Sequence, residues 1–240
     1  MRFSYSPYMQ ETFPQRVSCI LTVAAVDDQR DVAETARAFL ERARRRLADE
    51  SEGTFPEIQA WRRAYATMGL KPTQYRCAAE SLLRRFRKDG SLPDIHPLVD
   101  LCNAVSLANA VPVAVFDRDK IKGDLIVREA EGTETYLTFS GETETPEIGE
   151  VIFADAVSHA HARRWANRQS RHSAVSRQTR RALIVAEALH AGAAEDIARL
   201  AGDLGDAIAA TFGEQPESTL LLSSGEFYDS TDDGERSDVG

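Results

Sequence analysis

The residues best suited to chemistry lie in one stretch, residues 161–181. It holds seven arginines, two histidines and no acid, in a chain whose formal net charge is −9. Arginine binds phosphate and carboxylate bidentately and stacks on bases. Codon bias could explain a high arginine total, but it does not explain a cluster without an acid. The cluster therefore favours contact with a polyanion, although we expect about half of these arginines to pair with acids elsewhere in the fold.

Histidines supply the titratable groups of this region. His159 and His161 are two residues apart, which places them on one face of a strand, yet no acid or cysteine pattern completes a metal site. His172 is the candidate whose free pKa suits general-base work near neutral pH, although it could equally face solvent. Phosphate-loop, dinucleotide-binding and serine-hydrolase motifs are absent. We therefore expect neither a metal nor a cofactor.

The elements that must position these residues follow from periodicity and turn signals. Trp61 and Tyr65, four residues apart on one helix, either pack into the core or serve binding. Helices are predicted over 31–50, 56–69, 75–88, 97–110 and 193–213. Strands are predicted over 16–26, 113–117, 123–130, 133–139 and 150–155, with a strand beginning the segment 181–189. Helices followed by strands and a closing helix favour an α+β fold over alternating βαβ units.

Length and composition indicate the domain organisation. A chain of 240 residues with 42% hydrophobic and 28% charged residues suits one soluble domain, expected over 1–223. Residues 224–240 are acidic and poor in apolar side chains, so we expect a disordered tail.

The compartment is inferred from what the sequence does not contain. No apolar run is long enough to span a membrane, and the N-terminus lacks the apolar core of a secretory signal. Cys19, Cys77 and Cys102 are far apart and odd in number, which favours half-buried thiols over a disulfide framework. A reducing, cytoplasmic location is expected.

Four segments, taken in order, resemble a known family. They are "WRRAYATMGLKP", "LVDLCNAVSLANAVPVAVFDRDKIKGDLIVREA", "EVIFAD" and "RRWANRQSRHSAVSRQT". Together they are similar to a free-standing B3/B4 domain, the tRNA-editing domain of the phenylalanyl-tRNA synthetase β subunit, over about residues 60–190. The resemblance implies a β-sandwich of unusual topology with flanking helices. No aminoacylation module accompanies it, so the chain is not expected to be a ligase.

The resemblance also implies site residues. The expected catalytic positions are Asn103, Asp155 and His172, with Asp155 able to hold a substrate ammonium group. The expected substrate-binding positions are Cys102, Ala114, Ala154, Trp165, Gln169 and Ser170. The acid-free arginine cluster, together with a tRNA substrate, gives the expected tRNA-binding positions Arg163, Arg164, Arg168 and Arg171.

Two departures from the synthetase bear on specificity. Ala114 stands where the synthetase has a histidine, and His172 aligns with the glutamate that reads the hydroxyl of tyrosine. The glycine-rich turn of the synthetase is replaced by residues 167–170, as in stand-alone relatives. We therefore expect an amino acid other than tyrosine to be preferred.

The implied function is that of a trans-editing deacylase, which hydrolyses the ester of a mischarged tRNA. Ester hydrolysis needs an oriented water and donors for the developing oxyanion rather than a strong nucleophile. The expected partner is aminoacylated tRNA, with no membrane and no obligate protein partner. The alternatives are a non-catalytic module that binds tRNA, other RNA or an amino acid, and a hydrolase or sensor of another small amino-acid conjugate.

Overall fold

The computed structural model describes residues 1–222 and 225–230. The α-helices are α1 (Pro7–Thr12), α2 (Ala33–Asp49), α3 (Pro56–Thr67), α4 (Ala78–Asp89), α5 (Pro97–Asn109) and α6 (Ala193–Phe212); the 3-10 turns are η1 (Glu52–Thr54), η2 (Arg118–Lys120) and η3 (Arg171–Ser173). The strands are β1 (Arg2–Tyr5), β2 (Val17–Val23), β3 (Val113–Asp117), β4 (Leu125–Glu129), β5 (Tyr136–Leu137), β6 (Thr143–Glu144), β7 (Val151–Asp155), β8 (Ala160–Arg163), β9 (Arg168–Gln169), β10 (Ala182–Ala188), β11 (Glu217–Leu221) and β12 (Tyr228–Asp229).

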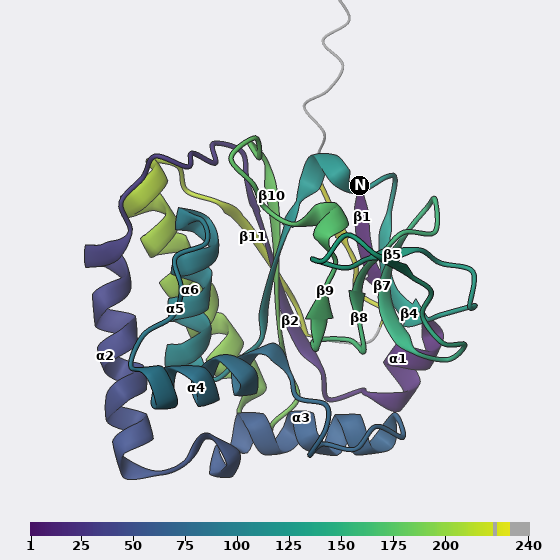
Figure 1. Ribbon diagram of the computed structural model, residues 1–240, viewed down its shortest axis with the longest axis horizontal. Coiled ribbons are helices and arrows are strands. Elements are labelled where there is room, and N and C mark those ends of the chain that lie inside the picture. Colours follow the sequence, from purple (N-terminus) through teal and green to yellow (C-terminus); the bar gives the residue numbers. More distant parts are fainter. Residues whose placement is uncertain (223–224, 231–240) are drawn as a thin grey trace, which may run out of the picture.

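Helices cover one face of a four-stranded antiparallel sheet with the order β11-β2-β10-β3. Figure 1 shows α2, α5 and α6 on that side of the sheet. Alternate residues of β2 and β10, such as Leu21 and Ile184, pack with Leu101 and Leu204 of the helices. Every residue of β10 is buried because both faces of this sheet are covered. No helix of the described residues combines the length and apolarity needed to cross a membrane.

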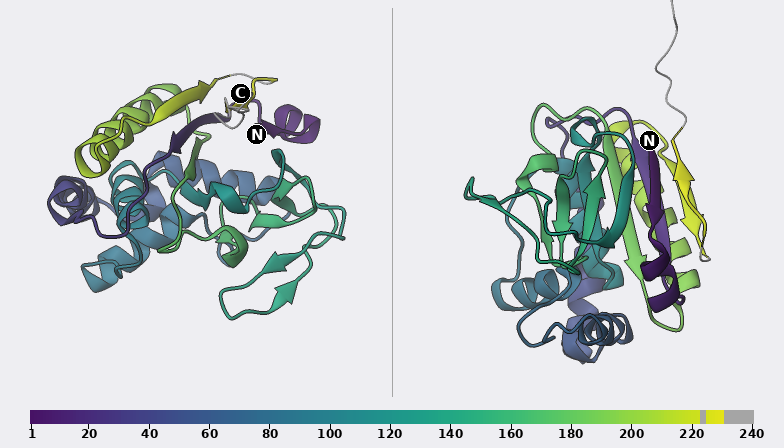
Figure 2. Two further views of the ribbon diagram at one scale, coloured as in Figure 1. Left: turned by 90° about the horizontal axis from the view of Figure 1, so that it is seen from above. Right: turned by 90° about the vertical axis from the view of Figure 1, so that its right-hand side faces the viewer.

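A six-stranded sheet lies against the other face of the first sheet. Its order is β12-β1-β4-β7-β8-β9, with β1 and β4 parallel and the other pairs antiparallel. Aromatic rings fill the space between the sheets: Phe153 of β7 lies 5.6 Å from Phe116 of β3 and 6.1 Å from Phe3 of β1, measured between ring centroids. Two facing sheets with flanking helices confirm the predicted α+β fold, and Figure 2 shows the layers from two further sides.

Most elements with strong periodicity form where the sequence places them. The predicted helices correspond to α2 through α6, and the segment 181–189 is a strand, β10. The helix that holds Trp61 and Tyr65 buries both rings in the core, so packing is the correct interpretation of that pair. The prediction of a long strand over 133–139 is wrong, since only Tyr136 and Leu137 pair there. Strand β1 and helix α1 were not predicted.

Two expectations about exposure are corrected. The three cysteines are buried rather than half-buried, and burial raises the pKa of the Cys19 and Cys77 thiols to about 12. The predicted disordered tail contains β12, whose Tyr228 is buried and donates or accepts a hydrogen bond with Thr22. Of that predicted tail, residues 224 and 231–240 lie outside the described residues.

Tyr228 is therefore expected to stabilise the fold. Its ring is 5% exposed and closes the β1 edge of the six-stranded sheet. Replacing Tyr228 with Ala should lower the free energy of unfolding by about 3 kcal/mol, as for other buried aromatic residues. Urea denaturation measures the change, with Leu222→Ala, at a half-exposed side chain, as the control. Equal stability of Tyr228→Ala and the control would contradict the packing of β12.

Candidate functional site

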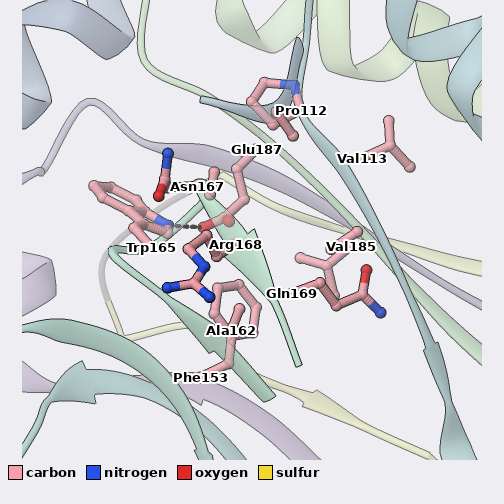
Figure 3. A pocket seen from close by; sticks show the side chains of 13 residues that line it. Pro112, Val113, Phe153, Ala162, Trp165, Asn167, Arg168, Gln169, Val185 and Glu187 are labelled. Carbon is pink, nitrogen blue, oxygen red and sulfur yellow. Dashed lines mark hydrogen bonds between the residues drawn. The ribbon is translucent and has the colours of Figure 1, made fainter. Parts of the chain in front are cut away.

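A cavity of about 60 Å³ lies between the two sheets, at the edges where β3 and β9 end them. Figure 3 shows this cavity and the side chains that line it. Its apolar wall comes from both sheets: Val113, Ala114, Phe153, Ala162 and Val185. Its polar groups come from β9, from the turn before it and from β10: Asn167, Arg168, Gln169 and Glu187. An apolar pocket with a few convergent polar groups is the usual form of a small-molecule site.

The turn that presents these polar groups has a strained backbone. Arg164 and Trp165 both have positive φ, 48° and 56°, a region that side-chain-bearing residues seldom adopt. Two hydrogen bonds of Trp165 hold the turn: the backbone N–H donates to the Val151 carbonyl at 2.8 Å, and Nε1 donates to Glu187 at 2.9 Å. The indole also packs edge-on against Trp61, with centroids 4.7 Å apart. Buried packing thus offsets the strain and fixes where the next residues point.

Two amides are positioned beside the cavity by backbone carbonyls. Gln169 Nε2 donates to the Val115 carbonyl of β3 at 2.6 Å and so links the two sheet edges. Asn167 Nδ2 donates to the Arg76 carbonyl at 2.7 Å. Neither amide oxygen accepts a hydrogen bond from a described side chain or backbone group. Both remain available to a ligand.

Glu187 is the functional candidate that sequence reasoning missed. Its carboxylate accepts from the Tyr5 hydroxyl at 2.7 Å and from Trp165 Nε1, and burial raises its pKa. The sequence signal was present: within the apolar strand β10, Glu187 has the same parity as Leu183 and Val185, which face the second sheet. An acid on the inner face of a covered strand is costly unless it is paired or functional.

Backbone groups of β3 also reach the cavity. Glu187 N–H donates to the Pro112 carbonyl at 3.4 Å, which makes this a hydrogen-bonded pair of the antiparallel register. Hydrogen-bonded and open positions alternate along an edge strand, so the N–H and C=O of Val113 point away from β10. The Val115 carbonyl points the same way and accepts from Gln169. The Val113 N–H is thus a backbone donor beside the cavity.

A second polar group, the histidine cluster, consists of Asp155, His159, His161, His172 and Ser173. Asp155 Oδ2 lies 3.2 Å from His161 Nε2 and 3.4 Å from His159 Nδ1. His161 Nδ1 shares a 2.8 Å hydrogen bond with the Ser173 hydroxyl, and the rings of His159 and His172 are 4.1 Å apart. The register shift between β7 and β8 brings His161 next to Phe116, at 6.3 Å between ring centroids. The sequence pattern did not indicate that Asp155 joins the histidine pair.

The Asp155 carboxylate is occupied by the protein itself. It accepts hydrogen bonds from the backbone N–H groups of Lys122, Val157 and His159, and its side chain has no exposed surface. Burial would raise the pKa of Asp155, but the neighbouring His161 and the N–H groups of His159 and Lys122 hold it well below its usual range. Burial and the neighbouring histidines lower the pKa of His172. The cluster fixes the β7–β8 connection rather than offering a free carboxylate.

The predicted site residues therefore fall into separate places. Ala114, Trp165 and Gln169 line the cavity, while Asp155 and His172 belong to the histidine cluster. The remaining predicted catalytic and substrate-binding positions lie away from the cavity lining: Cys102, Asn103, Ala154 and Ser170.

Each of those four has a clear local environment. Cys102 is buried between α5 and the four-stranded sheet, and Asn103, half-buried, follows it on the same helix. Ala154 packs on the outer face of the six-stranded sheet. The Ser170 hydroxyl donates to the Leu137 carbonyl and caps η3. Their predicted contact with substrate stays a prediction.

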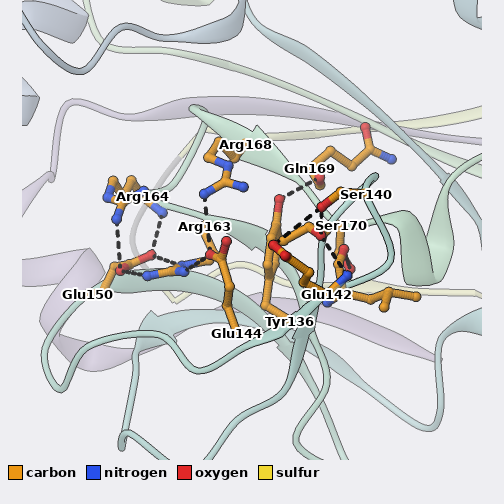
Figure 4. A network of polar contacts seen from close by, with 12 residues as sticks. Tyr136, Ser140, Glu142, Glu144, Glu150, Arg163, Arg164, Arg168, Gln169 and Ser170 are labelled. Carbon is orange, nitrogen blue, oxygen red and sulfur yellow. Dashed lines mark hydrogen bonds and ion pairs between the residues drawn. The ribbon is translucent and has the colours of Figure 1, made fainter.

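Most of the seven arginines pair within the chain, more than the expected half. Those with a carboxylate partner among the described residues are Arg163, Arg164, Arg168, Arg177 and Arg181. The Arg163 side chain is 5% exposed and holds both Glu144 and Glu150, as Figure 4 shows. That burial leaves Arg163 unavailable to a phosphate. Arg168 and Arg171 are exposed, so they are the accessible members of the predicted tRNA-binding set.

One group of potential metal ligands occurs among the described residues. Donor atoms of Glu57, His190 and Asp196 lie within 4.8 Å of one another. Arg46 donates to Glu57 at 2.6 Å and Arg199 donates to Asp196 at 2.5 Å. Since both carboxylates already pair with guanidinium groups, this arrangement is accounted for as an ion-pair network.

Comparisons with known proteins find a matching family model and similar chains. The family model of the B3/4 domain matches residues 60–207. A 76-residue segment, 32% of this chain, is 38% identical to the phenylalanine–tRNA ligase beta subunits of Rhodopseudomonas palustris and Bradyrhizobium diazoefficiens, but spans only 9% of the length of each. An N-terminal fragment of the phenylalanyl-tRNA synthetase beta subunit from Pyrococcus horikoshii matches 90% of this chain and 49% of its own, with 12% identity and a TM-score of 0.47.

The buried carboxylate of Asp155 makes a testable contribution to stability. Replacing Asp155 with Asn should lower the free energy of unfolding by about 2 kcal/mol at pH 7, since it removes charge-assisted hydrogen bonds. A depressed pKa stabilises the fold above the unfolded pKa of about 4, and this stabilisation is lost as the pH falls toward the folded pKa. The difference between wild type and Asp155→Asn should therefore shrink below about pH 4. Urea denaturation from pH 7 to 3 measures it, and a difference that does not depend on pH would refute the assignment.

Proposed function

Because the chain belongs to the B3/4 domain family, whose model matches residues 60–207, we propose that it is a trans-editing deacylase that hydrolyses the ester of mischarged aminoacyl-tRNA. The relatives named above are tRNA ligase subunits, which supports an association with tRNA aminoacylation. The chain covers a small part of the length of those subunits, and the proposed activity is hydrolysis of the ester.

The cavity is the observation that supports this proposal best. It combines Ala114, Trp165 and Gln169, three positions expected from the resemblance to bind substrate, with amide and carboxylate groups. Uncharged hydrogen-bonding groups and an oriented water suffice for hydrolysis of an activated ester, because positioning and fixed dipoles supply much of the barrier reduction.

Roles follow from the chemistry of each group. The Val113 N–H and the second N–H of the Gln169 amide are suited to stabilise the oxyanion that forms on the ester carbonyl. The Asn167 amide oxygen is suited to accept a hydrogen bond from the attacking water. Glu187 is suited to bind the α-ammonium group of the aminoacyl moiety, because an ammonium nearby favours the ionised carboxylate.

The size of the cavity supports a small amino acid. A volume of about 60 Å³ accommodates only a few water-sized groups, each of which needs roughly 10–15 Å³ in this measure. The small side chain of Ala114 leaves room in the cavity, but the rings of Phe153 and Trp165 that form its wall are held in place by core packing. A small or polar side chain fits this space better than the ring of tyrosine.

Deacylation across a panel of charged tRNAs tests the proposal. Under single turnover, seryl-, threonyl-, alanyl-, valyl- and isoleucyl-tRNA are compared with tyrosyl-tRNA. We expect a smaller amino acid to be released at least tenfold faster than tyrosine. Gln169→Ala should lower the rate constant by about 100-fold, the usual loss for one oxyanion donor. Gln29→Ala, at an exposed glutamine, is the matched control.

Two outcomes would overturn parts of this assignment. Tyrosyl-tRNA as the fastest substrate would refute the inferred specificity. Salt-dependent tRNA binding without hydrolysis of any charged tRNA would refute the deacylase and favour the non-catalytic tRNA-binding module. The observation behind that alternative is Ala114 in place of the synthetase's histidine.

Electrostatic contact with tRNA should depend on the accessible arginines. Each phosphate contact adds about 0.7–0.9 to the slope of log K against log salt concentration. Replacing Arg168 and Arg171 with Ala should therefore weaken binding of uncharged tRNA and reduce that slope by about 1.5. The control is Arg37→Ala with Arg45→Ala, two exposed arginines on α2 in the helical layer. An unchanged slope after loss of Arg168 and Arg171 would place the tRNA elsewhere.

A further inference from the structure

We propose that a groove beside the cavity, lined by Tyr136, Thr138, Phe139, Ser140, Arg168 and Gln169, binds the 3′-terminal adenosine of the tRNA, with its base stacked on Phe139. This inference rests on the proposed function and names the part of the substrate that lies outside the cavity.

Phe139 is the first observation that carries it. Its side chain is 66% exposed, although large aromatic side chains are normally buried. It lies in the segment between β4 and β7 that projects from the sandwich in Figure 2. Base–aromatic stacking is a main source of affinity for single-stranded nucleic acid and requires an open ring face of this kind.

The turn that carries Phe139 is held by its own hydrogen bonds. The Thr138 hydroxyl shares a 2.8 Å hydrogen bond with the Ser140 hydroxyl and accepts from the Glu142 N–H at 3.0 Å. Gly141 N–H donates to the Thr138 carbonyl at 3.1 Å, and a φ of 94° at Gly141 closes the turn with a backbone conformation that favours glycine. The ring is therefore presented on a fixed platform, which lowers the entropic cost of stacking.

Two arginines border the platform, whose own segment also carries Glu142 and Glu144. Arg168 is 41% exposed, packs its guanidinium 5.3 Å from the Tyr136 ring centroid and contacts Glu144 at 3.3 Å. Arg171 is exposed, and its Nη1 lies 3.7 Å from the position that a Cβ on Gly141 would occupy, so it borders the same turn. An exposed aromatic ring in a groove bordered by two arginines suits a nucleotide, whose base stacks while its phosphate pairs with arginine.

Continuity with the cavity identifies which nucleotide is bound. Arg168 and Gln169 line both the groove and the cavity. In an aminoacyl-tRNA the ester is attached to the ribose of the terminal adenosine, so base and ester are separated by one sugar. Two adjoining sites that share a wall are what a single aminoacyl-adenosine requires.

Binding of the trinucleotide CCA, which carries no ester, tests the groove directly. We expect Phe139→Ala to raise the dissociation constant for CCA about tenfold, the effect of losing one base–aromatic stack. Phe139→Trp should restore the wild-type affinity. Titration of the folded protein followed by NMR chemical shifts measures the affinity. Ile148→Ala, at a side chain that is exposed in the same β4–β7 segment but outside the groove, is the control.

The outcomes separate this inference from the proposed function. Affinity for CCA that is equal in wild type and Phe139→Ala overturns the groove, whatever the deacylation assay gives. A Phe139-dependent affinity in a protein that hydrolyses no aminoacyl-tRNA supports the groove and refutes the deacylase. Equal loss of affinity in Ile148→Ala and Phe139→Ala also overturns the proposal, because the effect would then not belong to stacking in the groove.

Discussion

A single buried carboxylate joins the two sheets and fixes the candidate site. Glu187 projects from the central strand β10, yet its hydrogen-bond donors belong to the second sheet and its connections: Tyr5 of β1 and Trp165 of the β8–β9 turn. Arg16 and Ser18 extend the network, since Arg16 Nη1 donates to the Ser18 hydroxyl, which in turn shares a hydrogen bond with Tyr5. A buried carboxylate without such partners would be strongly destabilising. The two sheets must therefore pack in one relative position. That position sets the direction of the β8–β9 turn.

Ion pairs explain why local sequence charge is a poor guide to surface charge here. The acid-free run of arginines finds its acids across the six-stranded sheet: Glu150 begins the β7 hairpin and Glu144 lies on the projecting segment, both close to Arg163. Because Arg163 also lies 5.5 Å over the Tyr136 ring, the network ties the projecting segment to the sandwich. The arginines thus have two roles: Arg163 ties the projecting segment to the sandwich, while Arg168 and Arg171 remain exposed.

Helices and strands that depend on residues close together in the sequence could be predicted. Helical periodicity and turn residues located α2 through α6, and β-branched runs located β2, β3, β7 and β10. Contacts distant along the chain were not predictable in the same way. In the sequence, Glu187 is only one polar residue in an apolar run. The pairing of β12 with β1 joins residues 227 positions apart. Asp155 and the histidines are close in sequence, but only the register shift beside His161 turns them into a cluster. The cavity itself arises from two sheet edges that no single segment describes.

The position of the cavity at two sheet edges also has a chemical consequence. In the middle of a sheet every backbone N–H is used in the ladder, so an interior strand has no donor to offer a ligand. An edge strand such as β3 keeps alternate N–H and C=O groups free, and free edges usually invite aggregation. Here Gln169 uses one of these groups and the bridge between Phe116 and Ala174 covers the edge further along. The Val113 N–H stays open beside the cavity, where an apolar wall lowers the local dielectric and strengthens any hydrogen bond that forms. An open backbone donor that would be a liability on a long edge is, in this enclosed position, well suited to binding a developing negative charge.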